Sequence, residues 1–319
     1  MTLAPTVAPQ GYVHETAFYG SDDDLLAVTV PFLEGGLAAG DATVVAFGGD
    51  NADLVRHAMP DADGLMFLTG REQYARPSVT IARYRQLLAD LVEGGAPRIR
   101  IVGDVPHPGV GVPWEAWSCY EAAVNHVLAE HPLWGLCPYD TRTAPDDVLL
   151  DACRTHPYVA TPDGRHHVNE LYEEPTRFLA SRTPPPPDAL EQRPPAVSLV
   201  QPTAAEARHA VADLALRSFL DSVAIENLVV GVSETVANAL LYGVPPVEVR
   251  AWAVPDRLLV TVTDHGPGPE DPYVGLVPRR PPDACHGGLG MWIANQLCDQ
   301  VTLVREPGRF TVRLVAGRP

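Results

Sequence analysis

Residues 231–243 constrain the fold of this chain more than any other stretch. They read GVSETVANALLYG, and apolar residues recur at helical spacing from just before them: Leu228, Val229, Val232, Val236, Ala239 and Leu240. This period predicts one buried amphipathic helix. Glu234 and Asn238 are four residues apart, so they project from the same face of that helix. Because a carboxylate and a carboxamide are costly to bury without partners, the pair indicates a site for a polar or metal-bearing ligand.

Two glycine-rich turns follow the helix. The first, Asp264-His265-Gly266-Pro267-Gly268, comes directly after an alternating strand at 258–263. The second, Gly287-Gly288-Leu289-Gly290, opens an apolar helix at 291–297. Glycines at a helix N-terminus let backbone N–H groups approach a phosphate closely, which favours a nucleotide site. The structural alternative is a polar pair satisfied within the core, beside two ordinary turns.

The helix with Glu234 and Asn238 and the two glycine-rich turns, in this order, resemble the ATP site of the GHKL (Bergerat-fold) superfamily. In sequence style they are most similar to the anti-sigma-factor serine kinases. The resemblance covers roughly residues 204–315. It implies a C-terminal two-layer α/β sandwich that binds ATP with Mg²⁺. Its sheet would be mixed and largely antiparallel, with hairpins at 247–263 and 301–314 and helices on one face.

The resemblance also implies a role for each site residue. Asn238 would offer its carbonyl oxygen to Mg²⁺, and Glu234 would orient or deprotonate the attacking hydroxyl or water. Asp264 would accept a hydrogen bond from the adenine amino group. The other residues would surround the nucleotide: Gly266 and Gly268 beside the base and ribose, Gly287, Gly288 and Gly290 around the phosphates, and Thr311 reaching adenine through water.

Residues 269–285, between the two glycine turns, are rich in proline and have no apolar period. In the resembled family this segment is a mobile ATP lid, so Arg279 and Arg280 would approach the γ-phosphate on closure. Two positions depart from the family's pattern. Tyr242 stands where a histidine is frequent in the family. His286 stands where the second glycine-rich turn often begins with glycine. Neither departure removes a catalytic group, although either could alter the handling of the phosphates.

In the first 180 residues, short apolar strands alternate with helices. The sequence predicts strands at 14–20, 42–47, 65–68, 98–102 and 134–138, and helices at 22–37, 53–59, 79–93 and 114–131. This alternation predicts a mostly parallel sheet covered on both faces. The first strand-to-helix turn carries Asp22, Asp23 and Asp24 instead of a phosphate loop, and the chain contains no lysine. Since three carboxylates repel a triphosphate, we expect this domain not to bind ATP.

The same region resembles the MEDS sensory domain, which looks like a degenerate RecA-type fold. The resemblance covers about residues 11–179 and rests on short motifs: His14, Tyr19, Glu121, Cys137-Pro138-Tyr139-Asp140 and His156-Pro157. His14, Tyr19, Glu121, Cys137, Asp140 and His156 are therefore the candidates for a pocket that takes a small organic signal.

The cysteines of this region, Cys119, Cys137 and Cys153, also invite a metal interpretation together with His14 and His156. None of them has C-x-x-C or H-x-x-x-H spacing, so ligands would have to converge from far apart in the sequence. Buried free cysteines are common core residues. The sequence therefore favours structural thiols and a metal-free domain, with the metal site and the small-ligand pocket as alternatives.

A chain of 319 residues predicts two domains. Proline runs place a linker at 181–196, between a sensory domain at 1–180 and an ATPase domain at 197–319. The net charge of −17 argues against nucleic acid as a direct partner. No apolar run reaches the length of a membrane span and the N-terminus lacks a secretion signal, which favours the cytoplasm and no membrane association. The oligomeric state, homodimer included, stays open.

Three functions from different classes fit these features. The first is an ATP- and Mg²⁺-dependent serine/threonine kinase that acts on an anti-sigma-factor antagonist and holds a sigma factor. The second is a switch that binds ATP and sequesters its partner without phosphoryl transfer, and Glu234 argues against it because such a switch can dispense with the carboxylate. The third is a histidine-kinase-like output domain. His209, on a helix predicted at 203–219, lacks the acidic neighbour and the dimerisation hairpin of a phosphoacceptor, and we interpret it as a surface residue.

Overall fold

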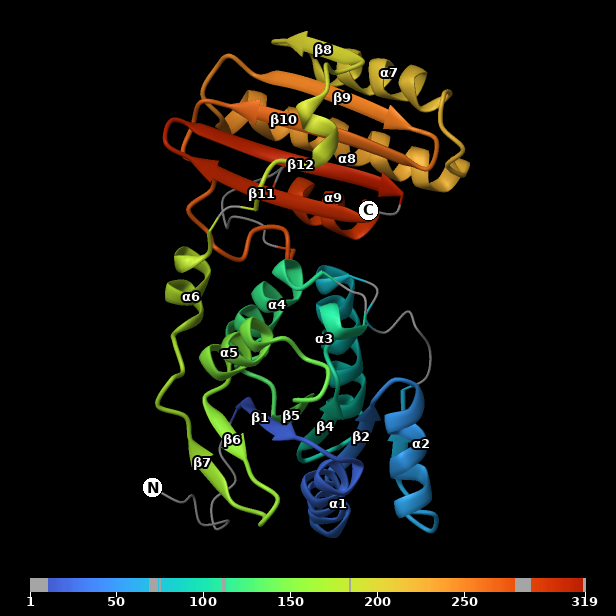
Figure 1. Cartoon of the computed structure of the whole chain (residues 1–319), viewed down its shortest axis with the longest axis vertical. Coiled ribbons are helices and arrows are strands. Elements are labelled where there is room, and N and C mark those ends of the chain that lie inside the picture. The colour runs from blue at the N-terminus through green and yellow to red at the C-terminus, as the bar shows by residue number, and fades with distance from the viewer. Residues whose placement is uncertain are drawn as a thin grey trace. The chain divides into compact units, whose positions relative to one another are not determined.

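The computed structural model describes residues 11–68, 74, 76–110, 113–183, 185–278 and 288–317. The chain forms two compact units, Met1–Ser181 and Arg182–Pro319. Each unit has its own sheet, coloured blue to green in the first and yellow to red in the second (Figure 1).

The first unit is built on a seven-stranded sheet in the order β3-β2-β4-β5-β1-β6-β7. Its strands are β1 (Val13–Tyr19), β2 (Ala42–Ala46), β3 (Leu65–Phe67), β4 (Ile99–Gly103), β5 (Leu133–Asp140), β6 (Tyr158–Ala160) and β7 (His166–Val168). All pairs are parallel except β6 with β7. The predicted mostly parallel sheet is confirmed.

Helices cover both faces of this sheet, as the alternating pattern predicts. They are α1 (Asp22–Ala39), α2 (Gly49–Ala58), α3 (Pro77–Glu93), α4 (Glu115–Val127) and α5 (Asp146–Thr155), and α6 (Pro175–Ser181) contacts α4 and α5. α1 and α2 pack on one face, and α3, α4 and α5 lie on the other (Figure 1). The helix predicted at 53–59 begins earlier, at Gly49, and the one predicted at 114–131 ends earlier, at Val127. α5 and α6 were not predicted, because both are short and α5 is rich in aspartate.

The second unit has a five-stranded sheet in the order β11-β12-β10-β9-β8. Its strands are β8 (Val197–Val200), β9 (Glu248–Val254), β10 (Arg257–Asp264), β11 (Gln300–Glu306) and β12 (Arg309–Gly317). Among the described residues every neighbouring pair is antiparallel, so the sheet is not mixed as predicted. Both predicted hairpins are present.

Three helices pack on one face of this second sheet. They are α7 (Ala204–Ala215), α8 (Ser222–Tyr242) and α9 (Gly290–Leu297), and one apolar core joins them to β9, β10 and β12. α8 is longer than the sequence predicts because Asp221 caps it, its side chain accepting a hydrogen bond from the Ala224 N–H at 2.7 Å. α7 is shorter than the predicted 203–219: it ends at Ala215, and Phe219 is 87% exposed.

The opposite face of this sheet is covered by part of the proline-rich segment that the sequence predicts as a linker. Leu190 packs there in a small apolar cluster with Trp252, Leu259 and Val315. Asp188, just before it, forms an ion pair with Arg257 at 2.7 Å. This segment therefore acts as a cover for the second sheet as well as a connection.

α8 is the one helix among the described residues that is long and apolar enough to cross a membrane by composition. It lies between α7 and α9 and buries Leu228, Val232 and Val236 completely against the sheet. A core helix of a soluble protein passes the same length and composition test.

Candidate functional site

The polar pair on α8 lies directly beside the start of α9. Gly290 is the first residue of α9, and a Cβ placed there would be 2.7 Å from Nδ2 of Asn238 and 2.9 Å from Oε2 of Glu234. Only glycine permits so close an approach. No side chain caps this end of α9 among the described residues, so its first N–H groups are available to an anion. The structure thus brings a carboxylate, a carboxamide and a helix N-terminus together.

Asp264 ends β10 and is held by one of its two carboxylate oxygens. Oδ1 accepts hydrogen bonds from the backbone N–H groups of Gly266 at 2.7 Å and Val244 at 3.2 Å. Oδ2 accepts no hydrogen bond from the described residues. The side chain is almost fully buried, at 4% exposure. Its orientation is therefore fixed, with one oxygen left for a ligand.

Thr311 lies on β12 beside Thr263 of β10, and their hydroxyl groups are hydrogen-bonded at 2.9 Å. Because Thr263 directly precedes Asp264, the threonine pair and the carboxylate occupy the same end of the two strands. Tyr242, at the end of α8, is exposed. His209 on α7 is also exposed, as expected of a surface histidine. Four residues of the predicted nucleotide site and lid lie outside the described residues: Arg279, Arg280, His286 and Gly287.

A second group of polar residues lies buried in the first unit, between the sheet and the helices α4 and α5. His14 comes from β1, Glu121 from α4, Cys137 from β5, and His156 directly follows α5. One ligand atom from each lies within 4.8 Å of the others. Nε2 of His14 is 3.2 Å from Oε2 of Glu121 and 3.5 Å from Sγ of Cys137, and Nε2 of His156 is 3.5 Å from the same Oε2. We refer to these four residues as the His-Glu-Cys-His cluster.

Burial sets the protonation of this cluster. It lowers the pKa of His14 and of His156 to about 3, so both rings are neutral at neutral pH. It also raises the pKa of the Glu121 carboxyl group and raises that of the Cys137 thiol well above its ordinary value. The contacts between the histidines and Glu121 are therefore not ion pairs, because no ring is charged.

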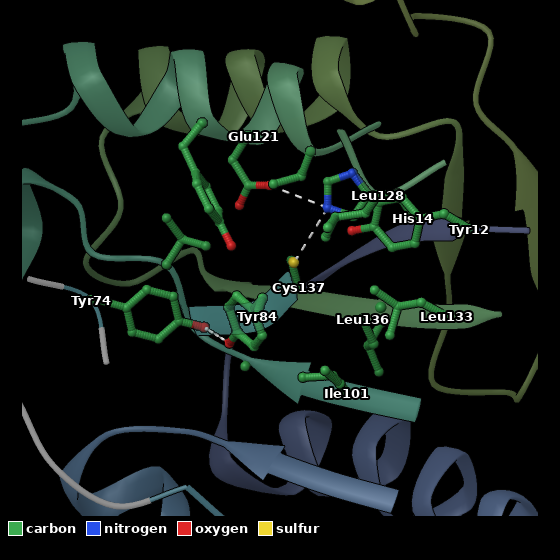
Figure 2. A pocket seen from close by; sticks show the side chains of 15 residues that line it. Tyr12, His14, Tyr74, Tyr84, Ile101, Glu121, Leu128, Leu133, Leu136 and Cys137 are labelled. Carbon is green, nitrogen blue, oxygen red and sulfur yellow. Dashed lines mark hydrogen bonds and ion pairs between the residues drawn. The ribbon is translucent and has the colours of Figure 1, made fainter. Parts of the chain in front are cut away.

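A cavity of about 40 Å³ adjoins the cluster. Figure 2 shows that Glu121, His14 and Cys137 face one another on one side of it, while Tyr74 and Tyr84 lie on another side. The hydroxyl groups of these two tyrosines are hydrogen-bonded at 3.0 Å. The remaining wall is mainly apolar and aromatic. A volume of this size holds roughly two or three waters, or a ligand of a few heavy atoms.

Comparisons with known proteins identify both domains. Residues 13–157 match the MEDS family, described as the methanogen/methylotroph, DcmR sensory domain. Residues 198–316 match the histidine kinase-like ATPase domain. The chain is a MEDS domain followed by a histidine kinase-like ATPase domain. The predicted MEDS domain and the predicted GHKL-type ATPase domain are confirmed, and the anti-sigma-factor kinase type stays a prediction.

The transcriptional repressor DcmR of Methylorubrum extorquens is 26% identical over 155 residues. The match covers 45% of this chain and 57% of DcmR, so the chain spans little more than half of that relative. Among solved structures, the RsbU and RsbW domains of a Mycobacterium tuberculosis protein match 40% of this chain and 34% of that one, with 20% identity and a TM-score of 0.27. The cytoplasmic domain of EssC matches 49% and 35%, with 11% identity and a TM-score of 0.31. At these scores neither structure informs the function.

In the MEDS domain the structure brings four of the six predicted pocket residues together and leaves two apart. Tyr19 is at the end of β1, where its hydroxyl accepts a hydrogen bond from Asn51 at 3.3 Å. Asp140 is at the end of β5 and pairs with Arg142 at 2.8 Å. Both stand at the carboxyl edge of the parallel sheet, whereas His14 is near the start of β1. Of the six candidates, His14, Glu121 and Cys137 line the cavity and His156 joins them in the cluster, whereas Tyr19 and Asp140 do neither.

The sequence missed several residues that surround the cluster. Tyr12, Tyr74, Tyr84 and Tyr120 line the cavity, and no local pattern marks them. Asn125, which contacts His14, had a usable signal: it is four residues after Glu121 on a predicted helix, so both project from one face.

The turn before α1 shows why we expect no ATP in the MEDS domain. The Gly20 N–H donates to Oδ2 of Asp24 at 3.2 Å, and the Asp24 N–H donates to Oγ of Ser21 at 3.1 Å. Two N–H groups of the turn are therefore already bound. Photolabelling of the full chain with 8-azido-ATP, followed by peptide mass spectrometry, should give saturable labels only within residues 182–319. A saturable, ATP-competed label within residues 13–157 would refute this expectation.

Gly268 of the ATPase domain offers a stability test of the first glycine-rich turn, Asp264–Gly268. Its φ is +77°, and a Cβ there would lie 2.5 Å from the Phe310 ring. Gly308, with φ of +70° and no atom within 4 Å of such a Cβ, is a matched control. A left-handed conformation costs an L residue roughly 1–2 kcal/mol, so Gly308→Ala should lose about that in free energy of unfolding. Gly268→Ala should lose roughly 1–3 kcal/mol more because of overpacking. Equal losses in urea unfolding would show that the Phe310 contact is unimportant.

Proposed function

We propose that this chain is a cytoplasmic regulator whose C-terminal domain is an ATP- and Mg²⁺-dependent serine/threonine protein kinase of the anti-sigma-factor type, controlled by the MEDS domain. The observation that carries the proposal is the contact of Gly290 with Glu234 and Asn238. In support of the proposal, a carboxylate that could accept a proton and a carboxamide that could bind a metal lie beside the N-terminus of α9. Phosphoryl transfer depends mainly on such positioning.

The residues present suit a Mg²⁺–ATP complex. Mg²⁺ prefers oxygen ligands and takes few from the protein, and Asn238 offers one. When bound, the ion would neutralise part of the phosphate charge. The first N–H groups of α9 would hold phosphate oxygens, with Gly288 and Gly290 leaving room for them. The free Oδ2 of Asp264 would accept a hydrogen bond from the adenine amino group and so select adenine. Gly266, Gly268 and Thr311 would complete the base pocket, and Glu234 would accept the proton of the attacking hydroxyl.

The partners proposed are a sigma factor and an antagonist protein that carries the phosphorylated serine or threonine. They rest on the sequence resemblance to the anti-sigma-factor kinases. The relative DcmR is named as a transcriptional repressor, which supports a role in transcription. A net charge of −17 disfavours direct contact with DNA, so this chain would act through proteins. A homodimer and a small-molecule ligand of the MEDS domain belong to the same proposal.

The test is incubation of the full chain with Mg²⁺, γ-labelled ATP and candidate antagonists encoded nearby. We expect label on the partner that survives acid, as a phosphoester of serine or threonine does. An acid-labile label on this chain would instead favour the histidine-kinase-like alternative. If the chain binds ATP and a sigma factor yet labels nothing, the ATP-binding switch without transfer is the correct function.

A further inference from the structure

We propose that the His-Glu-Cys-His cluster of the MEDS domain is a tetrahedral site for a divalent transition-metal ion of the zinc class. The ligands would be Nε2 of His14, Oε2 of Glu121, Sγ of Cys137 and Nε2 of His156. This inference does not depend on the proposed kinase activity, since it concerns the other domain.

The spacing of the four atoms fits tetrahedral coordination. Bonds of about 2.0–2.1 Å to nitrogen and oxygen and about 2.3 Å to sulfur place two N or O ligands roughly 3.3 Å apart, and N and S roughly 3.6 Å apart. The observed N–O distances are 3.2 Å and 3.5 Å, and the observed N–S distance is 3.5 Å. Three of the six ligand pairs are thus already at tetrahedral distances, and all six lie within 4.8 Å.

Neighbouring groups orient both histidines with a lone pair toward the centre. The His156 Nδ1–H donates to the Ala152 carbonyl oxygen at 2.8 Å, which leaves Nε2 unprotonated. Nδ1 of His14 is 3.2 Å from Oδ1 of Asn125. The Asn125 Nδ2 group donates to carbonyl oxygens, at 2.8 Å to that of Thr155, so its Oδ1 must accept from His14. Outer partners of this kind commonly fix metal-binding histidines.

Two buried atoms at the centre of the cluster lack a hydrogen-bond partner among the described residues. Oε1 of Glu121 accepts a hydrogen bond from the Tyr139 hydroxyl at 2.7 Å. Oε2, by contrast, has no hydrogen-bond partner among the described residues, and neither has Nε2 of His156. Both side chains are fully buried. Unpaired buried polar atoms are costly, and these two lie 3.5 Å apart. Either two protons or one divalent cation must therefore lie among the four ligand atoms of the His-Glu-Cys-His cluster.

The donor set selects the class of ion. Two imidazoles, one thiolate and one carboxylate suit Zn²⁺ and similar ions, whereas Mg²⁺ and Ca²⁺ take oxygen ligands. One thiolate and one carboxylate also balance the charge of a divalent ion, so the occupied cluster is neutral in its buried place. Because His14, Glu121 and Cys137 also line the cavity, the ion would stiffen the wall against which a small ligand binds.

The test uses the untagged full chain, stripped with a chelator and titrated with Zn²⁺ and Co²⁺. We expect one equivalent of metal per chain. The Co²⁺ form should show the intense visible bands of a tetrahedral ion and a thiolate-to-metal charge-transfer band. Cys137→Ser should remove the charge-transfer band, and Cys153→Ser, which changes another free thiol of the same domain, should keep it. Asn125→Ala should keep the band while Zn²⁺ affinity falls about tenfold to a hundredfold, as for an outer partner.

Folded wild-type protein that binds no metal stoichiometrically would overturn the proposal and leave a proton-sharing cluster. A charge-transfer band that persists in Cys137→Ser, or disappears in Cys153→Ser, would equally overturn it. Circular dichroism of each variant separates lost ligation from lost folding. If the Cys137→Ser variant does not fold, the Co²⁺ spectrum of Cys153→Ser is the remaining test. A charge-transfer band that persists in Cys153→Ser shows that a thiolate other than Cys153 binds the ion.

Discussion

Replacing Glu234 by glutamine should lower phosphoryl transfer by roughly two to four orders of magnitude and leave ATP binding nearly unchanged. Glutamine keeps the size of the side chain against Gly290 but cannot accept the proton of the attacking hydroxyl. The carboxylate acts mainly while the nucleophile attacks, so the loss should fall on turnover and not on affinity. Single-turnover transfer to a proven partner gives the first quantity, and calorimetry with Mg²⁺ and ATP gives the second.

Asn238→Ala on the same face of α8 is the control. It should weaken nucleotide binding in Mg²⁺ more than in a chelator, because it removes the proposed metal ligand. The two variants would then separate the two roles. Transfer at the wild-type rate in Glu234→Gln would rule out the carboxylate as the catalytic group.

Replacing Asp264 by asparagine should weaken ATP binding roughly tenfold to a hundredfold. Two backbone N–H groups already bind Oδ1, so the amide oxygen of asparagine must take that position. Its NH₂ group then replaces Oδ2 and points a donor at the adenine amino group, which is itself a donor. Leaving such a buried pair mismatched costs about 1–3 kcal/mol, which gives the expected loss of affinity.

Inosine triphosphate makes this prediction specific, because its base carries an oxygen where adenine has the amino group. The variant should lose its preference for ATP over inosine triphosphate, or reverse it. If both nucleotides weaken by the same factor, the change has disturbed the pocket in general and Asp264 does not select the base.

The ATPase domain could be predicted in large part because its signals are local. An interval of four residues on an apolar helix places Glu234 and Asn238 on one face, and Asp264 directly follows a recognisable strand. The contact between Gly290 and the α8 pair could not be predicted from spacing, because it joins positions more than fifty residues apart through the packing of α9 on α8. The same holds for residues 188–193, whose flanking prolines indicate an extended spacer while Leu190 packs on the sheet.

The MEDS domain shows the limit of spacing rules more clearly. Its strands and first helices follow from apolar periodicity, but its polar cluster does not. Parallel pairing of β1 with β5 sets Thr16 opposite Cys137, which brings His14 near that thiol although 123 residues separate them. His156 arrives from the end of α5, a short helix rich in aspartate that was not predicted. Metal-site patterns that count neighbours in the sequence therefore cannot detect such a cluster.

The most direct measurement is calorimetric titration of the full chain with ATP in Mg²⁺, repeated with GTP. If α8, β10 and α9 form a single adenine-specific site, one ATP should bind per chain, binding should weaken when Mg²⁺ is withheld, and GTP should bind far less tightly. Absence of saturable ATP binding, or equal affinity for ATP and GTP, would contradict the assignment of Glu234, Asn238 and Asp264 to a nucleotide site.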